Sequence, residues 1–129
     1  MKLVLDTSAY GALMRGDKEV ADRVRRAVGI VLPAVVVGEL NFGFRNGSRY
    51  EANRGDLNSF LENPFVEFLA VTMGTCDRFG MIAAGLRKKG TPIPVNDVWI
   101  AAQTMEIGGD LLTLDRHFER VDGLPVIVI

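Results

Sequence analysis

The sequence predicts an α/β protein of three layers, in which helices cover both faces of a central, mostly parallel sheet of about five short strands. Short apolar runs typical of buried strands alternate with longer segments whose apolar residues recur at helical spacing. Strands that alternate with helices are joined by crossover connections, and such connections build parallel sheets. The 129 residues, 48% of them hydrophobic, suit a single domain over residues 1–129, because no repeat or polar linker divides them.

In the first half of the chain, each predicted element has its own signal. "KLVL" is apolar enough for a buried strand, and the acid and serine that follow it suit a helix cap. "DKEVADRVRRAVG" places Val20, Val24 and Val28 on one face opposite charged residues, and Gly29 is expected to close this helix. "IVL" is a second strand, and Pro33 suits the first position of the next helix. The predicted elements are the strand 2–5, the helices 6–16 and 17–29, the strand 30–32 and the helices 33–47 and 49–61.

The second half repeats this alternation. "FVEFLAV" is typical of a strand, and the following segment is helical up to its basic last turn and Gly90. "TPIP" forces a loop, after which Asn96 is expected to cap a helix with Asp97 in its first turn. "DLLTLD" is a strand that ends in an acid. The predicted elements are the strand 65–71, the helix 72–90, a helix from residue 96, the strand 110–115, a short helix or turn over 116–123 and the strand 125–129.

Composition and charge exclude some classes of protein. The formal net charge is -1, from 15 Lys and Arg against 16 Asp and Glu, which argues against a uniformly basic nucleic-acid binder. No apolar run approaches the ~20 residues that cross a bilayer. The one cysteine, Cys76, forms no internal disulfide, and the N-terminus does not resemble a signal peptide. We therefore expect a cytoplasmic protein that neither spans nor binds a membrane.

Two acids follow predicted strands. The functional crevice of a parallel α/β sheet lies beyond the carboxyl ends of its strands, which is where Asp6 and Asp115 are expected. Thr113 precedes Asp115 by two residues on an extended segment, so both side chains are expected on the same side. An alternative is that each Asp only caps the helix that follows it.

Two further acids lie in apolar helices. Glu39 stands in "PAVVVGEL", where an unpaired buried carboxylate would cost several kcal/mol. It therefore needs a partner, either a bound cation or an arginine such as Arg45. Asp97 either complements the dipole of its helix or belongs to the same site. Four converging carboxylates repel one another unless a hard divalent cation neutralises them, and oxygen ligands favour Mg²⁺ or Mn²⁺.

The four acidic motifs resemble a known family. "LDTSA", "VVVGEL", "NDVWIAA" and "LLTLDRHF" occur in the order and in the element types of the PIN-domain ribonucleases, most closely the VapC-type toxins of type II toxin-antitoxin systems. The resemblance covers essentially the whole chain. It implies a PIN-like fold and a Mg²⁺- or Mn²⁺-dependent endoribonuclease, a hydrolase that cleaves RNA phosphodiester bonds with water and leaves 5'-phosphate and 3'-hydroxyl ends.

The resemblance also implies site residues and partners. The expected metal ligands and catalytic residues are Asp6, Glu39, Asp97 and Asp115, with Ser8 and Thr113 as accessory hydroxyls. The expected partners are the RNA substrate, a small cognate antitoxin protein and a second copy of the chain in a homodimer. DNA is expected to be contacted only indirectly, through the antitoxin. His117 is expected to be a turn residue stacked near Phe118, because the acidic site needs no further acid or base.

Other readings predict a different function. A non-catalytic PIN-fold partner in a repressor complex would keep the fold without the chemistry. A receiver-like Mg²⁺-binding signalling module would need adjacent acids after the first strand and a late lysine, and both are missing. Two further groups of residues could have a function but have a simpler explanation. Several basic residues are candidates to contact RNA, but an ordinary solvated surface explains them. Several apolar helix residues are explained by packing in the core. The basic residues are Arg15, Arg45, Arg49, Arg87, Lys88, Lys89 and Arg116, and the apolar ones are Phe42, Phe44, Phe60 and Met81.

Overall fold

The computed structural model describes residues 2–129 and contains a five-stranded sheet. The strands lie in the order β3-β2-β1-β4-β5, and all four neighbouring pairs are parallel. The predicted sheet is therefore confirmed. Its strands are β1 (Lys2–Leu5), β2 (Gly29–Pro33), β3 (Val66–Leu69), β4 (Asp110–Thr113) and β5 (Val126–Val128).

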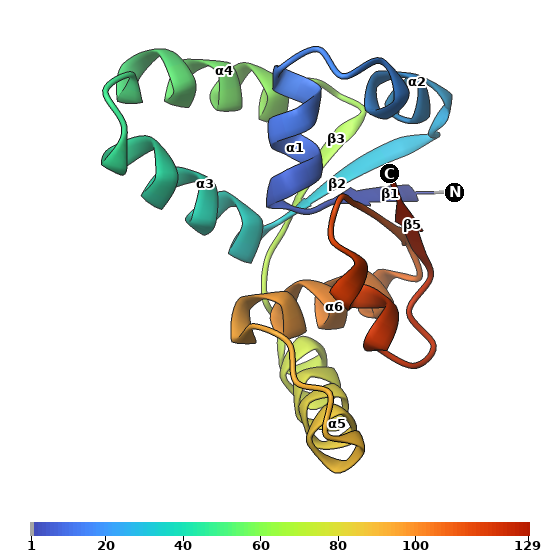
Figure 1. The fold of residues 1–129 in the computed structure, drawn as a ribbon. Helices are drawn as coiled ribbons and strands as arrows, with labels where there is room; N and C mark the ends of the chain where they lie inside the picture. Colours follow the sequence, from blue (N-terminus) through green and yellow to red (C-terminus); the bar gives the residue numbers. More distant parts are fainter. Residues whose placement is uncertain (1) are drawn as a thin grey trace.

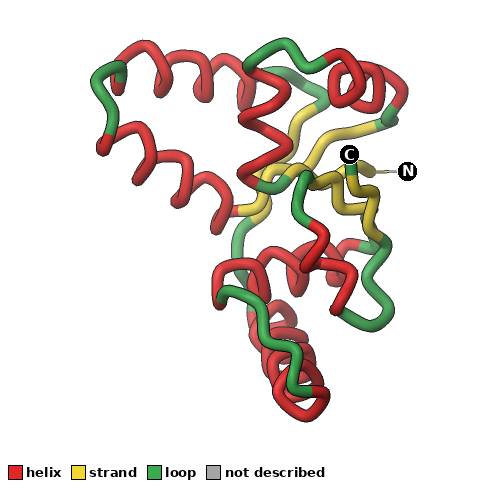
Figure 2. Tube along the Cα trace, viewed as in Figure 1, coloured by secondary structure: helices red, strands yellow, loops and turns green. Residues whose placement is uncertain are grey.

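Helices cover both faces of this sheet, as predicted (Figure 1). The helices α1 to α4 connect β1 to β2 and β2 to β3 and lie on one side, whereas α5, α6 and the short 3-10 helix η1 lie on the other. Figure 2 shows the strands as a thin layer between the two groups. The helices are α1 (Thr7–Met14), α2 (Lys18–Arg26), α3 (Ala34–Asn46), α4 (Tyr50–Glu62), α5 (Met73–Lys89), α6 (Val95–Ile107) and η1 (Arg116–Arg120).

The direction of the crossovers explains this arrangement. The chain moves outward from β1 to β2 and β3, then returns past β1 to form β4 and β5 on its other side. Because crossovers are right-handed, a reversal of direction puts the connecting helices on the opposite face. The reversal also leaves a crevice at the carboxyl ends of β1 and β4, which is where ligands bind in sheets of this kind.

The central strands form the core. Leu5, Val31 and Leu112 are completely buried because helices cover both faces of the sheet. The strands β3 and β5 are more exposed because they lie at the two edges of the sheet. Within residues 2–129, no helix is both long and apolar enough to span a membrane.

Three predicted helix boundaries are wrong. Pro33, expected at the first position of a helix, is the last residue of β2, and α3 begins at Ala34. The helix α2 ends at Arg26, because Gly29 pairs with Lys2 and already belongs to β2. Val28, which the helical pattern placed on the buried face, is 70% exposed. Asn96 does not cap α6 either, since the helix begins at Val95 and the Pro94 carbonyl accepts the first hydrogen bonds.

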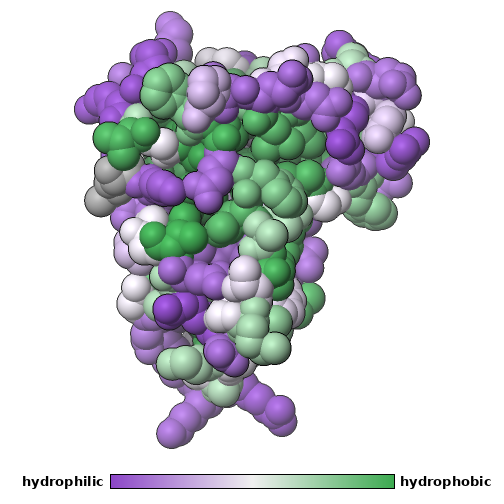
Figure 3. All heavy atoms as spheres, turned by 180° about the vertical axis from the view of Figure 1, so that it is seen from behind, coloured by the Kyte–Doolittle hydropathy of each residue, from purple (hydrophilic) through white to green (hydrophobic). Residues whose placement is uncertain are grey.

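Two large apolar side chains expected in the core are exposed instead. Phe42 on α3 is 70% exposed and Met81 on α5 is 74% exposed, whereas Phe44 and Phe60 pack against the core as expected. The helix α5 packs chiefly against α6, so its outer face meets solvent. Figure 3 shows hydrophobic side chains across the middle of one molecular face, bordered by hydrophilic ones.

Gly109 provides a test of the packing between β1 and the turn before β4. A Cβ atom there would lie 2.9 Å from Val4 Cγ2 and 3.3 Å from the Lys2 carbonyl oxygen. We expect Gly109→Ala to lower the free energy of unfolding by about 1–3 kcal/mol, as overpacking does. Gly80→Ala is the matched control: no atom approaches within 4 Å, and alanine raises helix propensity by about 1 kcal/mol. Urea unfolding should shift in opposite directions for the two variants, and equal shifts would contradict this packing.

Candidate active site

A cavity of about 430 Å³ opens beyond the carboxyl ends of β1 and β4. Segments that are distant in the sequence meet there: the start of α1, the middle of α3, the start of α6 and the residue before η1. Four carboxylates line this cavity and no lysine or arginine does. The lining residues are Asp6, Thr7, Ser8, Glu39, Pro94, Val95, Asn96, Asp97 and Asp115.

Asp6 is the most buried of the four acids, at 4% exposed. It follows β1 in extended conformation and caps α1, accepting a hydrogen bond from the Ala9 backbone N–H at 2.8 Å. The Ser8 hydroxyl donates to the Asp6 Oδ1 atom at 2.7 Å, and the Thr113 hydroxyl donates to Oδ2. Asp6 therefore does cap α1, which was the alternative explanation, and it also lines the cavity.

Glu39 is half-buried rather than enclosed in the apolar helix. The Thr7 hydroxyl donates to its Oε1 atom at 2.6 Å, and the Asn96 amide donates to its Oε2 atom at 3.2 Å. The arginine partner offered for it is wrong, because the Arg45 guanidinium lies over the Tyr50 ring, 3.6 Å from its centroid. Neutral hydrogen-bond donors, and no cationic side chain, satisfy this carboxylate.

His117 joins the other two acids. Asp97 lies in the first turn of α6, and its Oδ2 atom is 2.6 Å from His117 Nε2. Asp115 precedes η1, and its Oδ1 atom is 3.3 Å from His117 Nδ1. The ring of His117 also lies against Phe118, with centroids 4.8 Å apart, as the sequence predicts. Its contact with both acids was not predicted.

The charges of the acids act on one another. Burial raises the pKa of Asp6, the charge of Asp115 adds to this rise, and hydrogen bonds from Thr113, Ala9 and Ser8 oppose it. Burial likewise raises the pKa of Asp97, and the charges of Glu39 and Asp6 add to it, whereas His117 lowers it. Asp6 and Asp97 therefore lie where negative charge is disfavoured, chiefly because of burial and in part because of the neighbouring carboxylates.

A family model described as the PIN domain matches residues 3–124. This span is nearly the whole chain. The chain belongs to the PIN domain family.

Known relatives support a narrower likeness for this PIN domain. Ribonuclease VapC1 of Haemophilus influenzae is 29% identical, over 96% of this chain and 95% of the relative. The solved structure of VapBC-1 from nontypeable Haemophilus influenzae matches at 27% identity with a TM-score of 0.88, over 99% of this chain and 98% of that chain. VapBC2 from Rickettsia felis, solved bound to a DNA fragment from their promoter, matches at 22% identity with a TM-score of 0.90, over 100% of this chain and 99% of that chain, a likeness of fold alone. The resemblance to VapC-type proteins is thus confirmed.

The PIN domain brings most of the predicted site residues together. All four acids and Ser8 line the cavity, whereas Thr113 is fully buried beneath it and reaches Asp6 by a hydrogen bond. Sequence reasoning missed the contact of Asn96 with Glu39 and that of His117 with two acids. The only signal for His117 was its place two residues after Asp115.

The donor set of the cavity fits a hard divalent cation. Its side chains offer carboxylate, hydroxyl and amide oxygens, and no lysine or arginine lines it. With the side chains as they stand, no three His, Cys, Asp or Glu residues between positions 2 and 129 are close enough to hold one ion. Binding of one ion by three or more of these acids therefore requires the carboxylates to move closer together than they stand here.

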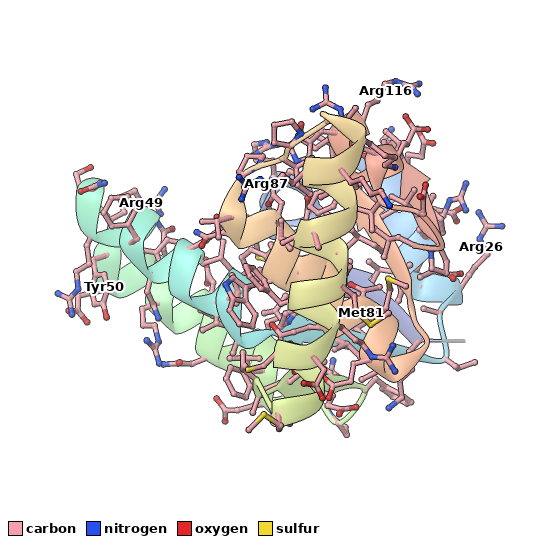
Figure 4. The ribbon with its side chains drawn as sticks, turned by 90° about the horizontal axis from the view of Figure 1, so that it is seen from below. Arg26, Arg49, Tyr50, Met81, Arg87 and Arg116 are labelled. Atoms are coloured by element: carbon pink, nitrogen blue, oxygen red, sulfur yellow. The ribbon has the colours of Figure 1, made fainter. Side chains whose placement is uncertain are left out.

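The basic residues that are candidates to contact RNA lie outside the cavity lining. Figure 4 shows Arg49 and Arg116 at the outer edge of the molecule. Lys89 binds the Arg120 carbonyl and the Asp122 carboxylate. Arg87 borders an apolar groove that shares Val95 with the acidic cavity. A role for these residues in RNA binding stays a prediction.

Proposed function

We propose that this PIN domain is a Mg²⁺- or Mn²⁺-dependent endoribonuclease and the toxin of a toxin-antitoxin pair. The observation that carries the proposal is the convergence of Asp6, Glu39, Asp97 and Asp115 on one cavity without a basic side chain. Relatives that cover nearly the whole chain are named ribonuclease VapC. We also propose that residues 1–129 act as a single domain in the cytoplasm.

The residues of the site have separate tasks in this proposal. The four carboxylates would hold the cation, and the cation would attract the phosphodiester that they alone repel. Ser8 and Thr113 fix the orientation of Asp6, and Thr7 and Asn96 fix that of Glu39. A divalent cation bound there supplies a Lewis acid that polarises a phosphate oxygen and lowers the pKa of a water nucleophile. The 2'-hydroxyl of RNA plays no part as a nucleophile.

Metal removal is the first test. We expect incubation with a chelator to abolish RNA cleavage and excess Mg²⁺ or Mn²⁺ to restore it, because the carboxylates alone repel the phosphodiester. The cleavage products should carry 5'-phosphate and 3'-hydroxyl ends, which enzymatic end-labelling distinguishes. Cleavage that persists in chelator, or products with 2',3'-cyclic phosphates, would count against the proposal. An absence of cleavage across varied RNAs would instead favour a non-catalytic partner in a repressor complex.

The proposal includes a protein partner. Several of the solved neighbours are VapBC assemblies, and the one from Rickettsia felis was solved with a DNA fragment from their promoter. We propose that a small antitoxin covers the acidic cavity, that the chain forms a homodimer, and that DNA is contacted only through the antitoxin. Co-expression with the protein encoded beside it, followed by size-exclusion chromatography, tests the pairing. Failure to co-elute would oppose the toxin assignment without bearing on the nuclease chemistry.

A further inference from the structure

His117 is held in place by the core rather than by solvent-facing contacts. It lies in η1 beside Phe118, which is completely buried, and its ring packs against the Phe118 ring at a centroid distance of 4.8 Å. The side chain is 19% exposed. Because the ring is held in this way, it has little freedom to rotate, and it can orient the side chains that it contacts.

Both nitrogens of the ring face carboxylates. Nε2 lies 2.6 Å from Asp97 Oδ2, and because a carboxylate only accepts hydrogen bonds, Nε2 is the donor. Nδ1 lies 3.3 Å from Asp115 Oδ1, a longer and weaker contact that becomes an ion pair when the ring is protonated on both nitrogens. Across residues 2–129, no other side-chain hydrogen bond reaches the Asp97 carboxylate, and no side chain other than that of His117 pairs with Asp115. His117 is thus the one group that orients Asp97, and each acid keeps an oxygen that His117 does not use.

His117 is better placed to orient ligands than to be one. Its nitrogens are already directed at the two acids, and it is not among the residues that line the cavity. We infer that His117 is a positioning residue that holds the Asp97 carboxylate, and more weakly that of Asp115, so that their free oxygens bind a divalent cation. This inference rests on the proposed function, since it needs a cation in the cavity.

The inference predicts a graded loss of metal affinity. Groups that orient ligands typically account for about 10–100-fold in metal affinity, and we expect a loss of this size for His117→Ala. A glutamine amide nitrogen reaches about as far as Nε2, so His117→Gln should recover most of the affinity. An asparagine amide reaches only about as far as Nδ1, so His117→Asn should resemble the alanine variant. A merely structural role would not separate Gln from Asn.

Binding of Mn²⁺ to the RNA-free protein is the direct test, measured by the loss of the free-ion electron paramagnetic resonance signal. The control is Glu119→Gln, in the same short helix but paired only with the exposed Arg116. It should bind Mn²⁺ as the wild-type protein does. Circular dichroism checks the fold, and if the alanine variant does not fold, the comparison of Gln with Asn remains decisive.

The outcomes separate the inference from the function on which it rests. Wild-type binding with a loss in the Ala and Asn variants and recovery in the Gln variant supports the inference. Wild-type binding with unchanged affinity in His117→Ala, or with equal losses for Gln and Asn, overturns it and leaves the proposed nuclease intact. If the wild-type protein itself binds no Mn²⁺, the proposed function fails and the inference fails with it.

Discussion

Asp6→Asn is expected to lower Mg²⁺-dependent RNA cleavage by more than about 100-fold, because loss of a metal ligand should exceed the 10–100-fold cost of removing a group that only orients one. Asparagine can keep the cap on the Ala9 N–H and accept from Ser8, so the local structure should survive. Asp122→Asn is the matched control, because the Asp122 side chain is 89% exposed and outside the cavity. Initial cleavage rates on one RNA compare the three proteins, and activity in Asp6→Asn close to that of wild type would contradict the assignment.

The same variant, Asp6→Asn, is expected to lose activity but to keep or gain thermal stability. Burial raises the pKa of Asp6, so the folded protein holds this proton more tightly than the unfolded chain does. In the metal-free protein, the free energy of unfolding therefore falls as pH rises from the ordinary Asp pKa through the raised one, and this cost persists at neutral pH. Asp6→Asn removes the cost, so its thermal midpoint in chelator should be at or above that of wild type near neutral pH. A large drop in the midpoint would show that lost activity reflects unfolding.

Phe118→Ala is expected to lower the free energy of unfolding by about 3–5 kcal/mol, the usual cost of deleting a buried phenylalanine ring. Phe118 is completely buried and belongs to η1, which connects β4 to the last strand of the sheet. Phe42→Ala is the control: that ring is 70% exposed, and its loss should change stability by no more than about 0.5 kcal/mol. Denaturant unfolding measures both. Similar values for the two variants would mean that η1 is not anchored as described.

The sequence predicts the fold well because its signals are local. Apolar runs bounded by glycine and proline mark the strands, and helical spacing marks the segments between them. The errors at Gly29 and Asn96 arise where tertiary contacts decide the boundary: Gly29 pairs with Lys2, and Pro94 ends the loop one residue before α6. The order of the strands depends on pairing between distant segments, which no local pattern reports.

The acidic site was predictable only in part. Asp6 and Asp115 follow from the rule that ligands bind at the carboxyl ends of parallel strands. Glu39 was selected because its apolar helix was expected to bury the carboxylate. This reason is wrong, since α3 is partly exposed and the carboxylate is only half-buried. His117 was missed because its contact with Asp97 depends on how η1 lies against α6. A histidine after a strand-end acid resembles a turn residue until that packing is known.

The proposed function requires that four carboxylates from distant segments bind divalent metal in one cavity. Anomalous diffraction from crystals grown with Mn²⁺ tests it most directly. We predict a strong Mn²⁺ peak in the cavity within coordination distance of oxygens from Asp6 and Asp97, with Glu39 and Asp115 turned toward the same ion or a neighbouring one. A cavity that stays free of Mn²⁺ at saturating concentration, or a peak that lies only at other surface acids, would contradict the account.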